Sequence, residues 1–99
     1  MSRPSKLSPA EVASALSSLP DWSIVEGKLH RDYKFADFPS AFAFMTAVAL
    51  AAEKMDHHPG WTNVYNRVTV DLWTHDAGGI TRLDIDLAGK MEQLAHQIR

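Results

Sequence analysis

The sequence predicts an α+β domain in which helices cover one face of an antiparallel sheet. Three stretches repeat apolar residues at helical spacing, and the stretches between them alternate apolar and polar residues as strands do. The chain has 99 residues, the length of one domain. In so small a domain, helices of this kind can cover only one face of the sheet. We therefore expect a flexible tail over residues 1–6 and a single domain over residues 7–99.

The composition excludes several classes of protein. Hydrophobic residues make up 45% and charged residues 22%, which is typical of a globular domain rather than a disordered chain. No apolar run approaches the roughly 18 residues of a membrane span, and residues 1–6 lack the apolar segment of a secretory signal, so a cytoplasmic location is expected. A net charge of −2 argues against direct nucleic-acid binding. With no cysteine, a disulfide framework, a thiolate metal site and a cysteine nucleophile are all excluded.

The first helix is expected to begin after Ser8. The segment Ser8-Pro9-Ala10-Glu11 combines a capping serine, a proline at the first helical position and a glutamate three residues after the cap. Apolar residues follow at helical spacing as far as Leu19, and Pro20 ends the helix. Two alternating stretches on either side of the turn Glu26-Gly27-Lys28 then predict a β-hairpin.

The clearest helix is expected over residues 38–56, and it has two apolar stripes. An amphipathic surface helix needs only one such stripe, so the second must be covered by the same chain or by another subunit. We favour a subunit interface, which predicts a homodimer or homotetramer formed through helix 38–56, through a sheet edge, or through both. One stripe consists of Phe38, Phe42, Met45, Ala49 and Ala52, and the other of Phe44, Val48, Ala51 and Met55.

Residues 63–75 alternate again and predict one long strand, or two short ones bent near Asn66-Arg67. His75 follows Tyr65 by ten residues, an even number, so both side chains would lie on one face of an unbroken strand. The apolar face of this segment is expected to consist of Val64, Val68, Val70 and Leu72.

The last helix is expected to begin after a glycine-containing turn at residues 76–79. The segment Thr81-Arg82-Leu83-Asp84 has the form of a capping box with aspartate in place of glutamate. Apolar residues from Leu87 to Ile98 recur at helical spacing and make this helix amphipathic.

The chemistry is expected at the histidines, of which there are five. Glu53 and His57 are four residues apart and share a face if the helix persists that far, so the carboxylate would orient the ring and favour its protonation. His58 would project in another direction. A histidine near a helix C-terminus is also commonly a simple capping cation, and Asp84 in a first helical turn commonly supports only the cap. Likewise, Trp61 and Trp73 could stack on a flat ring or pack in the core.

Other kinds of site are less favoured by the motifs. Histidines and carboxylates are suitable zinc ligands, but adjacent histidines on a helix diverge by about 100° and do not form the spacing of a helical metal site. The sequence has no glycine-rich phosphate loop and no Gly-x-Ser-x-Gly elbow. The remaining class is general acid–base catalysis by histidine, in which each proton transfer contributes about 10²–10⁴-fold.

The spacing of these residues resembles the signature of the pterin-4a-carbinolamine dehydratases. The match consists of Glu53-x-x-x-His57-His58-Pro59, followed at fixed distances by Tyr65, His75 and Asp84. The resemblance extends over nearly the whole chain, from about Leu7 onward. It implies a four-stranded antiparallel sheet with three helices packed on one face, and association as dimers or tetramers.

The resemblance also implies an activity. These enzymes dehydrate a 4a-hydroxytetrahydropterin to the quinonoid dihydropterin without a metal or redox cofactor, since the pterin is the substrate. They recycle the pterin of aromatic amino-acid hydroxylases, usually phenylalanine hydroxylase. Two other functions stay open: a dimerisation partner of a transcription factor, as in animal members, and an accessory role in another pterin pathway such as that of molybdopterin.

The resemblance places the site residues as follows. The catalytic set would be Glu53, His57, His58, His75 and Asp84. The substrate-contacting set would be Asp56, His57, His58, Pro59, Trp61, Trp73, Thr74, His75 and Asp76. We expect His57 and His75 to be the acid–base groups and His58 to position the substrate, while the two carboxylates orient the rings.

Overall fold

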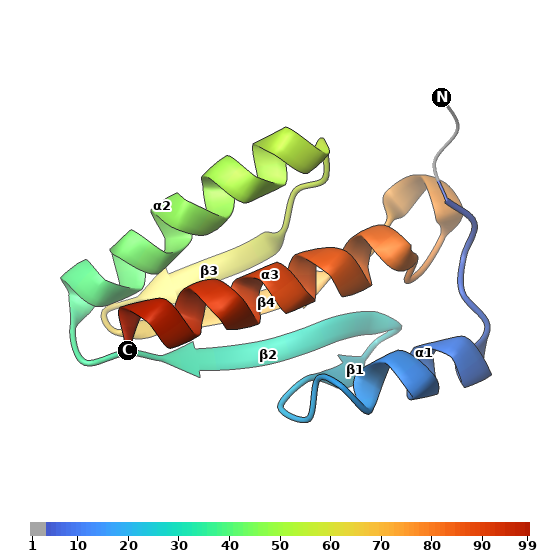
Figure 1. Cartoon of the computed structure of the whole chain (residues 1–99), viewed down its shortest axis with the longest axis horizontal. Helices are drawn as coiled ribbons and strands as arrows, with labels where there is room; N and C mark the ends of the chain where they lie inside the picture. Colours follow the sequence, from blue (N-terminus) through green and yellow to red (C-terminus); the bar gives the residue numbers. More distant parts are fainter. Residues whose placement is uncertain (1–3) are drawn as a thin grey trace.

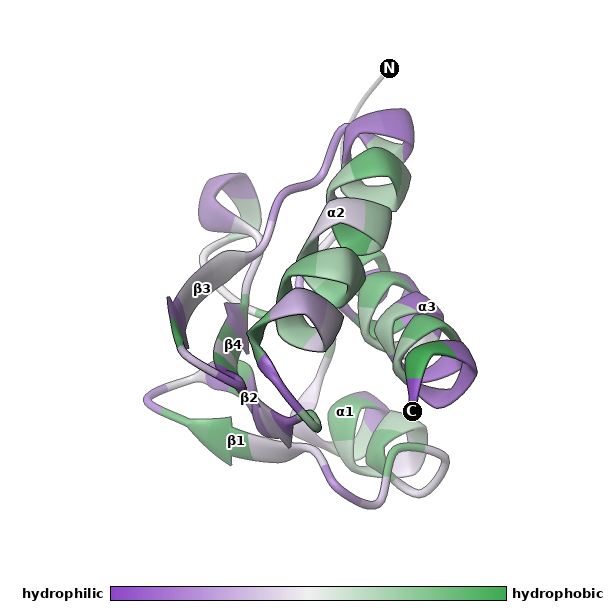
Figure 2. Cartoon of the chain, turned by 90° about the vertical axis from the view of Figure 1, so that its left-hand side faces the viewer, coloured by the Kyte–Doolittle hydropathy of each residue, from purple (hydrophilic) through white to green (hydrophobic). Residues whose placement is uncertain are grey.

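The computed structural model describes residues 4–99 and shows an α+β fold. Four strands form one antiparallel sheet in the order β1-β2-β4-β3. The three α-helices all lie on the same side of this sheet (Figures 1 and 2), so the predicted fold class is confirmed. The elements are α1 (Pro9–Leu16), β1 (Ser23–Val25), β2 (Lys28–Lys34), α2 (Phe38–Met55), β3 (Gly60–Val64), β4 (Arg67–Leu72), the 3₁₀ helix η1 (His75–Ala77) and α3 (Arg82–Ile98). Of the tail expected over residues 1–6, the first three residues lie outside the described ones.

The helix starts are those that the sequence predicts. Ser8 and Glu11 form the expected reciprocal capping box at α1, with N···O distances of 2.9 and 3.1 Å. Thr81 and Asp84 form the second box at α3. Helix α1 ends at Leu16, earlier than the predicted Leu19, because the amides of residues 17–19 bond to carbonyls three residues back and tighten the chain into turns.

Of the two alternatives predicted for residues 63–75, the structure has the two short strands and not the single long one. The chain reverses at Tyr65, whose φ of 51° is left-handed, and β3 and β4 pair as an antiparallel hairpin. Val64 therefore lies opposite Arg67 and is 74% exposed, so its predicted place on the buried face is wrong. The reversal also removes the premise that Tyr65 and His75 share a face.

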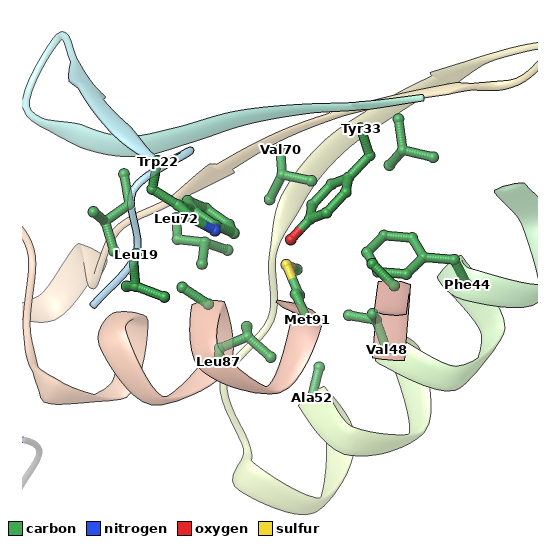
Figure 3. Packing of buried hydrophobic residues seen from close by; sticks show 14 of the residues in the cluster. Leu19, Trp22, Tyr33, Phe44, Val48, Ala52, Val70, Leu72, Leu87 and Met91 are labelled. Atoms are coloured by element: carbon green, nitrogen blue, oxygen red, sulfur yellow. The ribbon is translucent and has the colours of Figure 1, made fainter. Parts of the chain in front are cut away.

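The core lies between the sheet and helices α2 and α3 (Figure 3). Tyr33 of β2, Val70 of β4, Phe44 of α2 and Met91 of α3 are all fully buried there. One of the two predicted stripes on α2, the one that contains Phe44, is thus covered by the chain itself. The other leaves Phe38 and Phe42 about half exposed.

A partly buried ionic cluster connects β2 to α3. The guanidinium of Arg31 donates from Nη1 to both carboxyl oxygens of Glu92 at 2.9 Å and to Asp21 at 3.2 Å. Glu92 also accepts from Trp22 Nε1 and from the Tyr33 hydroxyl. Burial, and then the bond to Glu92, raise the pKa of Tyr33, which keeps its hydroxyl protonated as a donor.

Removal of Glu92 should therefore destabilise the fold. We expect Glu92→Ala to lower the free energy of unfolding by about 2 kcal/mol, because Arg31 is left buried with only the exposed Asp21 as partner. Urea denaturation measures this change. The control is Asp86→Ala, which breaks the exposed Arg82–Asp86 pair and should cost less than about 0.5 kcal/mol. Equal losses of unfolding free energy in the two variants would contradict the stabilising role of Glu92.

On the open face of the sheet, His30 pairs with Asp71 on the neighbouring strand. His30 Nδ1 lies 2.9 Å from Asp71 Oδ1, and Nε2 lies 3.4 Å from Asp32 Oδ2. The bond to Asp71 raises the pKa of His30 above its ordinary value, and Asp32 adds to this against the opposing effect of burial. Because the pKa of His30 is higher in the folded protein than in the unfolded chain, protonation of His30 stabilises the fold. This stabilisation is complete at pH values below the pKa of the unfolded chain, and it is lost as the pH rises through the pKa of the folded protein.

The raised pKa of His30 predicts that the loss of stability in His30→Gln depends on pH. The variant should lose more unfolding free energy, relative to the wild type, at about pH 5.5 than at about pH 9, where the imidazole is neutral. Urea midpoints at the two pH values test this expectation. A difference in unfolding free energy between the wild type and His30→Gln that does not change with pH would refute it.

Candidate functional site

A pocket of about 240 Å³ opens where two segments of the chain meet. Residues 57–60 connect α2 to β3, and residues 73–76 follow β4. Because β3 and β4 are antiparallel neighbours, the start of one and the end of the other lie at the same end of the sheet, with Gly60 opposite Asp71. The hairpin thus brings together the two segments that carry three of the five histidines.

The end of α2 determines where the paired histidines point. Asp56 is left-handed, with a φ of 52°, and the His57 amide donates to Ala52 O at 3.1 Å, which is the pattern of a Schellman motif. The chain therefore turns sharply after Asp56. As a result His57 is buried, whereas the His58 side chain is 58% exposed.

The expected pairing of Glu53 with His57 is not present. Glu53 Oε1 instead lies 2.8 Å from His58 Nε2. The helix ends before residue 57, so the four-residue spacing no longer places the two side chains on one face. Both members of the Glu53–His58 pair are exposed, so the pair orients the His58 ring but adds little stability.

His57 is held by Asp84. The distance from His57 Nε2 to Asp84 Oδ1 is 2.6 Å, and the Asp84 side chain is fully buried. Its other oxygen accepts from the Thr74 hydroxyl and from the Thr81 amide, both at 2.9 Å. Asp84 is therefore both the partner of His57 and a member of the capping box of α3. The sequence had left open whether Asp84 supports the helix cap or orients a histidine, and in the structure it contacts both.

Most of the predicted substrate-contacting residues border the pocket, and so does Gly60, which was not predicted. The residues that line the pocket are His57, His58, Pro59, Gly60, Trp73, Thr74, His75 and Asp76. Asp56 does not line it, because it occupies the C-cap of α2. Trp61 does not line it either: it lies opposite Val70 in the register, on the helix side of the sheet, and packs against the core.

Gly60 has a physical reason to be glycine. A Cβ at this position would lie 2.8 Å from Cζ3 of Trp73. The indole thus rests on the Gly60 backbone, with Lys28 Nζ 4.0 Å from the ring centroid. In the sequence, Gly60 is identifiable only as part of the Pro59-Gly60 pair that ends a helix.

We expect Gly60→Ala to displace the Trp73 ring and to cost about 1 kcal/mol of unfolding free energy, because the added methyl overlaps the indole. The control is Gly89→Ala in α3, where an added Cβ meets nothing within 4 Å and should stabilise the helix by up to about 1 kcal/mol. NMR of the Trp73 indole N–H and urea denaturation measure the two effects. An unchanged chemical shift of the Trp73 indole N–H in Gly60→Ala would contradict the close contact between Gly60 and Trp73.

Within residues 4–99, no group of three or more His, Asp or Glu side chains is placed to hold a metal, and no helix is both long and apolar enough to cross a membrane. A larger hollow of about 420 Å³ lies between α1 and the loop before α3. Its lining is mostly aliphatic, and its one titratable side chain among the described residues is Lys6, so it offers no acid–base pair.

The smaller pocket has the groups that acid–base chemistry needs. A buried imidazole with a carboxylate partner, His57, borders the same space as the exposed imidazoles of His58 and His75. Imidazoles donate and accept protons near neutral pH. Trp73 adds an aromatic side chain to the lining. The arrangement suits a planar heterocycle on which one proton is added and another removed.

Comparison with known proteins agrees with this description. A family model described as Pterin 4 alpha carbinolamine dehydratase matches residues 5–94. A protein of Solibacter usitatus, provisionally named as a pterin-4-alpha-carbinolamine dehydratase, is 62% identical over 91% of this chain and 95% of its own. One of Mesorhizobium japonicum with the same provisional name is 58% identical over 87% and 90%.

Solved structures show the same fold. A protein from Brucella melitensis described as a transcriptional coactivator/pterin dehydratase superposes with a TM-score of 0.88 at 49% identity, covering 91% of this chain and 98% of that one. A pterin dehydratase-like protein described as a RuBisCO assembly factor of the alpha-carboxysome gives a TM-score of 0.62 at 20% identity, covering 75% and 86%. At that identity the likeness concerns the fold alone.

Proposed function

Because the chain belongs to the pterin-4a-carbinolamine dehydratase family, we propose that it dehydrates a 4a-hydroxytetrahydropterin to the quinonoid dihydropterin. The observation that supports this most strongly is the buried His57–Asp84 pair at a pocket that His58 and His75 also line. A carboxylate-held imidazole beside two further histidines supplies the groups that general acid–base catalysis needs.

The reaction needs two proton transfers and no net redox change. The bond between C4a and its hydroxyl oxygen breaks, and a general acid protonates that oxygen so that it leaves as water. A carbon–nitrogen double bond forms as a general base takes the proton from the neighbouring ring nitrogen. Each transfer by a positioned histidine contributes about 10²–10⁴-fold.

The geometry suggests how the residues divide this work. His57 and His75 approach the pocket from its two segments and would exchange the two protons. His58, oriented by Glu53, would hold the substrate. Trp73, which packs closely on Gly60, would contact the pterin with its indole ring.

The test is a coupled assay with a pterin-dependent hydroxylase, phenylalanine hydroxylase being the natural choice. The decay of the 4a-hydroxytetrahydropterin absorbance is followed with and without the protein. We expect the protein to accelerate the decay. If the folded protein leaves the uncatalysed rate unchanged, the proposal fails.

Self-association is a second part of the proposal, and the surface of α2 favours it. Phe42 is 54% exposed and Leu50 72% exposed on this helix, and β3 has a free edge in the sheet. We propose that the chain associates with itself through these surfaces as a homodimer or homotetramer. Light scattering of the wild type and of Phe42→Asp tests this: a smaller assembly in the variant supports it, and a monomeric wild type opposes it.

A further inference from the structure

We propose that Lys28 is a positioning residue of the pterin pocket, because its ammonium group holds the Trp73 indole where that ring borders the pocket. Lys28 does not line the pocket itself, so it acts on substrate binding through Trp73. The effect on substrate binding rests on the proposed function. The effect on the position of the indole does not, because it follows from the contacts around the ring.

The register of the sheet places Lys28 beside Trp73. Leu29 of β2 pairs with Leu72 of β4, so the next pair across the two chain segments is Lys28 and Trp73. Both side chains lie on the open face of the sheet, because they alternate with the buried Leu29 and Leu72. The ammonium nitrogen lies over the indole ring, 4.0 Å from its centroid. At this distance the electrons of the ring face attract the cation.

The contact with Gly60 alone does not fix the orientation of the indole. Gly60 approaches the ring at Cζ3 and Cη2, which lie at one edge of the six-membered ring. The indole N–H that donates a side-chain hydrogen bond within residues 4–99 is that of Trp22, not that of Trp73. Trp73 is also only partly buried, so the ring has room to turn about its side-chain bonds. The cation on the ring face therefore restricts a rotation that Gly60 leaves open.

The ammonium group of Lys28 is available for this contact. Within residues 4–99, Lys28 forms no ion pair. Asp32 and Asp71 lie on the same face of the sheet, but both contact the ring of His30. Lys28 is partly buried, and a cation–π contact is stronger where water is partly excluded.

The loss of this contact should affect substrate affinity rather than the chemical step. A displaced indole removes part of the pocket lining, which weakens substrate binding. His57 and His75 keep their places, because neither contacts Lys28, so the proton transfers are unaffected. The expected signature is therefore a raised KM with an unchanged kcat.

Steady-state kinetics in the coupled hydroxylase assay test this expectation. Lys28→Met keeps the apolar stem without the charge, and it should raise KM about fivefold and change kcat by less than about twofold. Lys28→Arg keeps a cation that can lie on the indole face, so it should restore KM. The matched control is Lys34→Met, which removes a lysine from the same face at the other end of β2 and should leave both constants unchanged.

NMR of the two side chains tests the contact without any need for activity. The Cε protons of Lys28 are next to the nitrogen that lies over the ring, so the ring current should shift them upfield in the wild type. They should return to ordinary values in Trp73→Leu. The Trp73 indole N–H signal should move in Lys28→Met and stay in place in Lys34→Met.

A double variant shows whether Lys28 acts through Trp73. In Trp73→Leu there is no ring left to hold, so the further substitution Lys28→Met should leave KM unchanged. An equal rise of KM in both backgrounds would mean that Lys28 acts by its charge alone, and it would overturn the inference. An unchanged KM in Lys28→Met, or ordinary Cε shifts of Lys28 in the wild type, would also overturn it. If the NMR signals behave as expected but the wild type shows no dehydration, only the proposed function fails.

Discussion

His57→Ala is expected to lower kcat/KM for pterin dehydration by about 10²–10⁴-fold, the largest effect of any single substitution in the chain. His57 is the one buried imidazole at the pocket, and its carboxylate partner holds it in a fixed orientation. His75 is exposed and has no such partner among the described side chains, so its loss should cost less. The coupled hydroxylase assay measures both variants.

Two further variants make this prediction specific. His57→Gln keeps an N–H donor for Asp84 but cannot exchange a proton near neutral pH, so it should fold well and remain inactive. His96→Ala changes an exposed histidine in the last turn of α3 and should leave the rate unchanged. Activity close to that of the wild type in His57→Gln would remove His57 from the reaction.

Asp84→Ala is expected to have the largest effect on stability, a loss of about 3–5 kcal/mol of unfolding free energy. The substitution leaves three buried donors without their acceptor: His57 Nε2, the Thr74 hydroxyl and the Thr81 amide. It also removes half of the capping box of α3. Urea or thermal denaturation measures this loss.

The comparison with a simple cap separates these contributions. Asp37 caps α2 through one bond to the Ser40 amide and is exposed, so Asp37→Ala should cost only about 1 kcal/mol. The excess in Asp84→Ala is the cost of the buried network. If both variants lose the same amount, Asp84 contributes only as a cap and the network adds nothing to stability.

Local patterns in the sequence predict those features that depend on neighbours along the chain. The capping boxes at Ser8 and Thr81, the long α2 and the hairpin around Gly27 are all of this kind. The assembly of two histidine segments at one pocket agrees with the spacing of the family signature. The capping boxes, α2 and the hairpin around Gly27 needed no knowledge of which distant strands pair.

The features that the sequence did not predict depend on single backbone angles or on strand order. Because Asp56 is left-handed, the helix ends before residue 57, and Glu53 contacts His58 instead of the predicted His57. Helical periodicity cannot indicate where such a residue ends a helix. A second, Tyr65, determines that residues 63–75 form two strands, an alternative that the sequence offered beside one long strand without deciding between them. The His30–Asp71 pair exists only because β2 lies beside β4, which alternation alone does not specify.

The carboxylate of Asp84 joins the pocket to the first turn of α3, and this connection has a consequence for local unfolding. Fraying of that helix end must release Asp84 from His57, so each such opening event also disassembles the site. The amides of Leu83 and Asp84, which bond to Thr81, should therefore report on the pocket although neither residue lines it. A molecule that binds through His57 only when the site is assembled should slow hydrogen exchange at these two amides in proportion to its saturation.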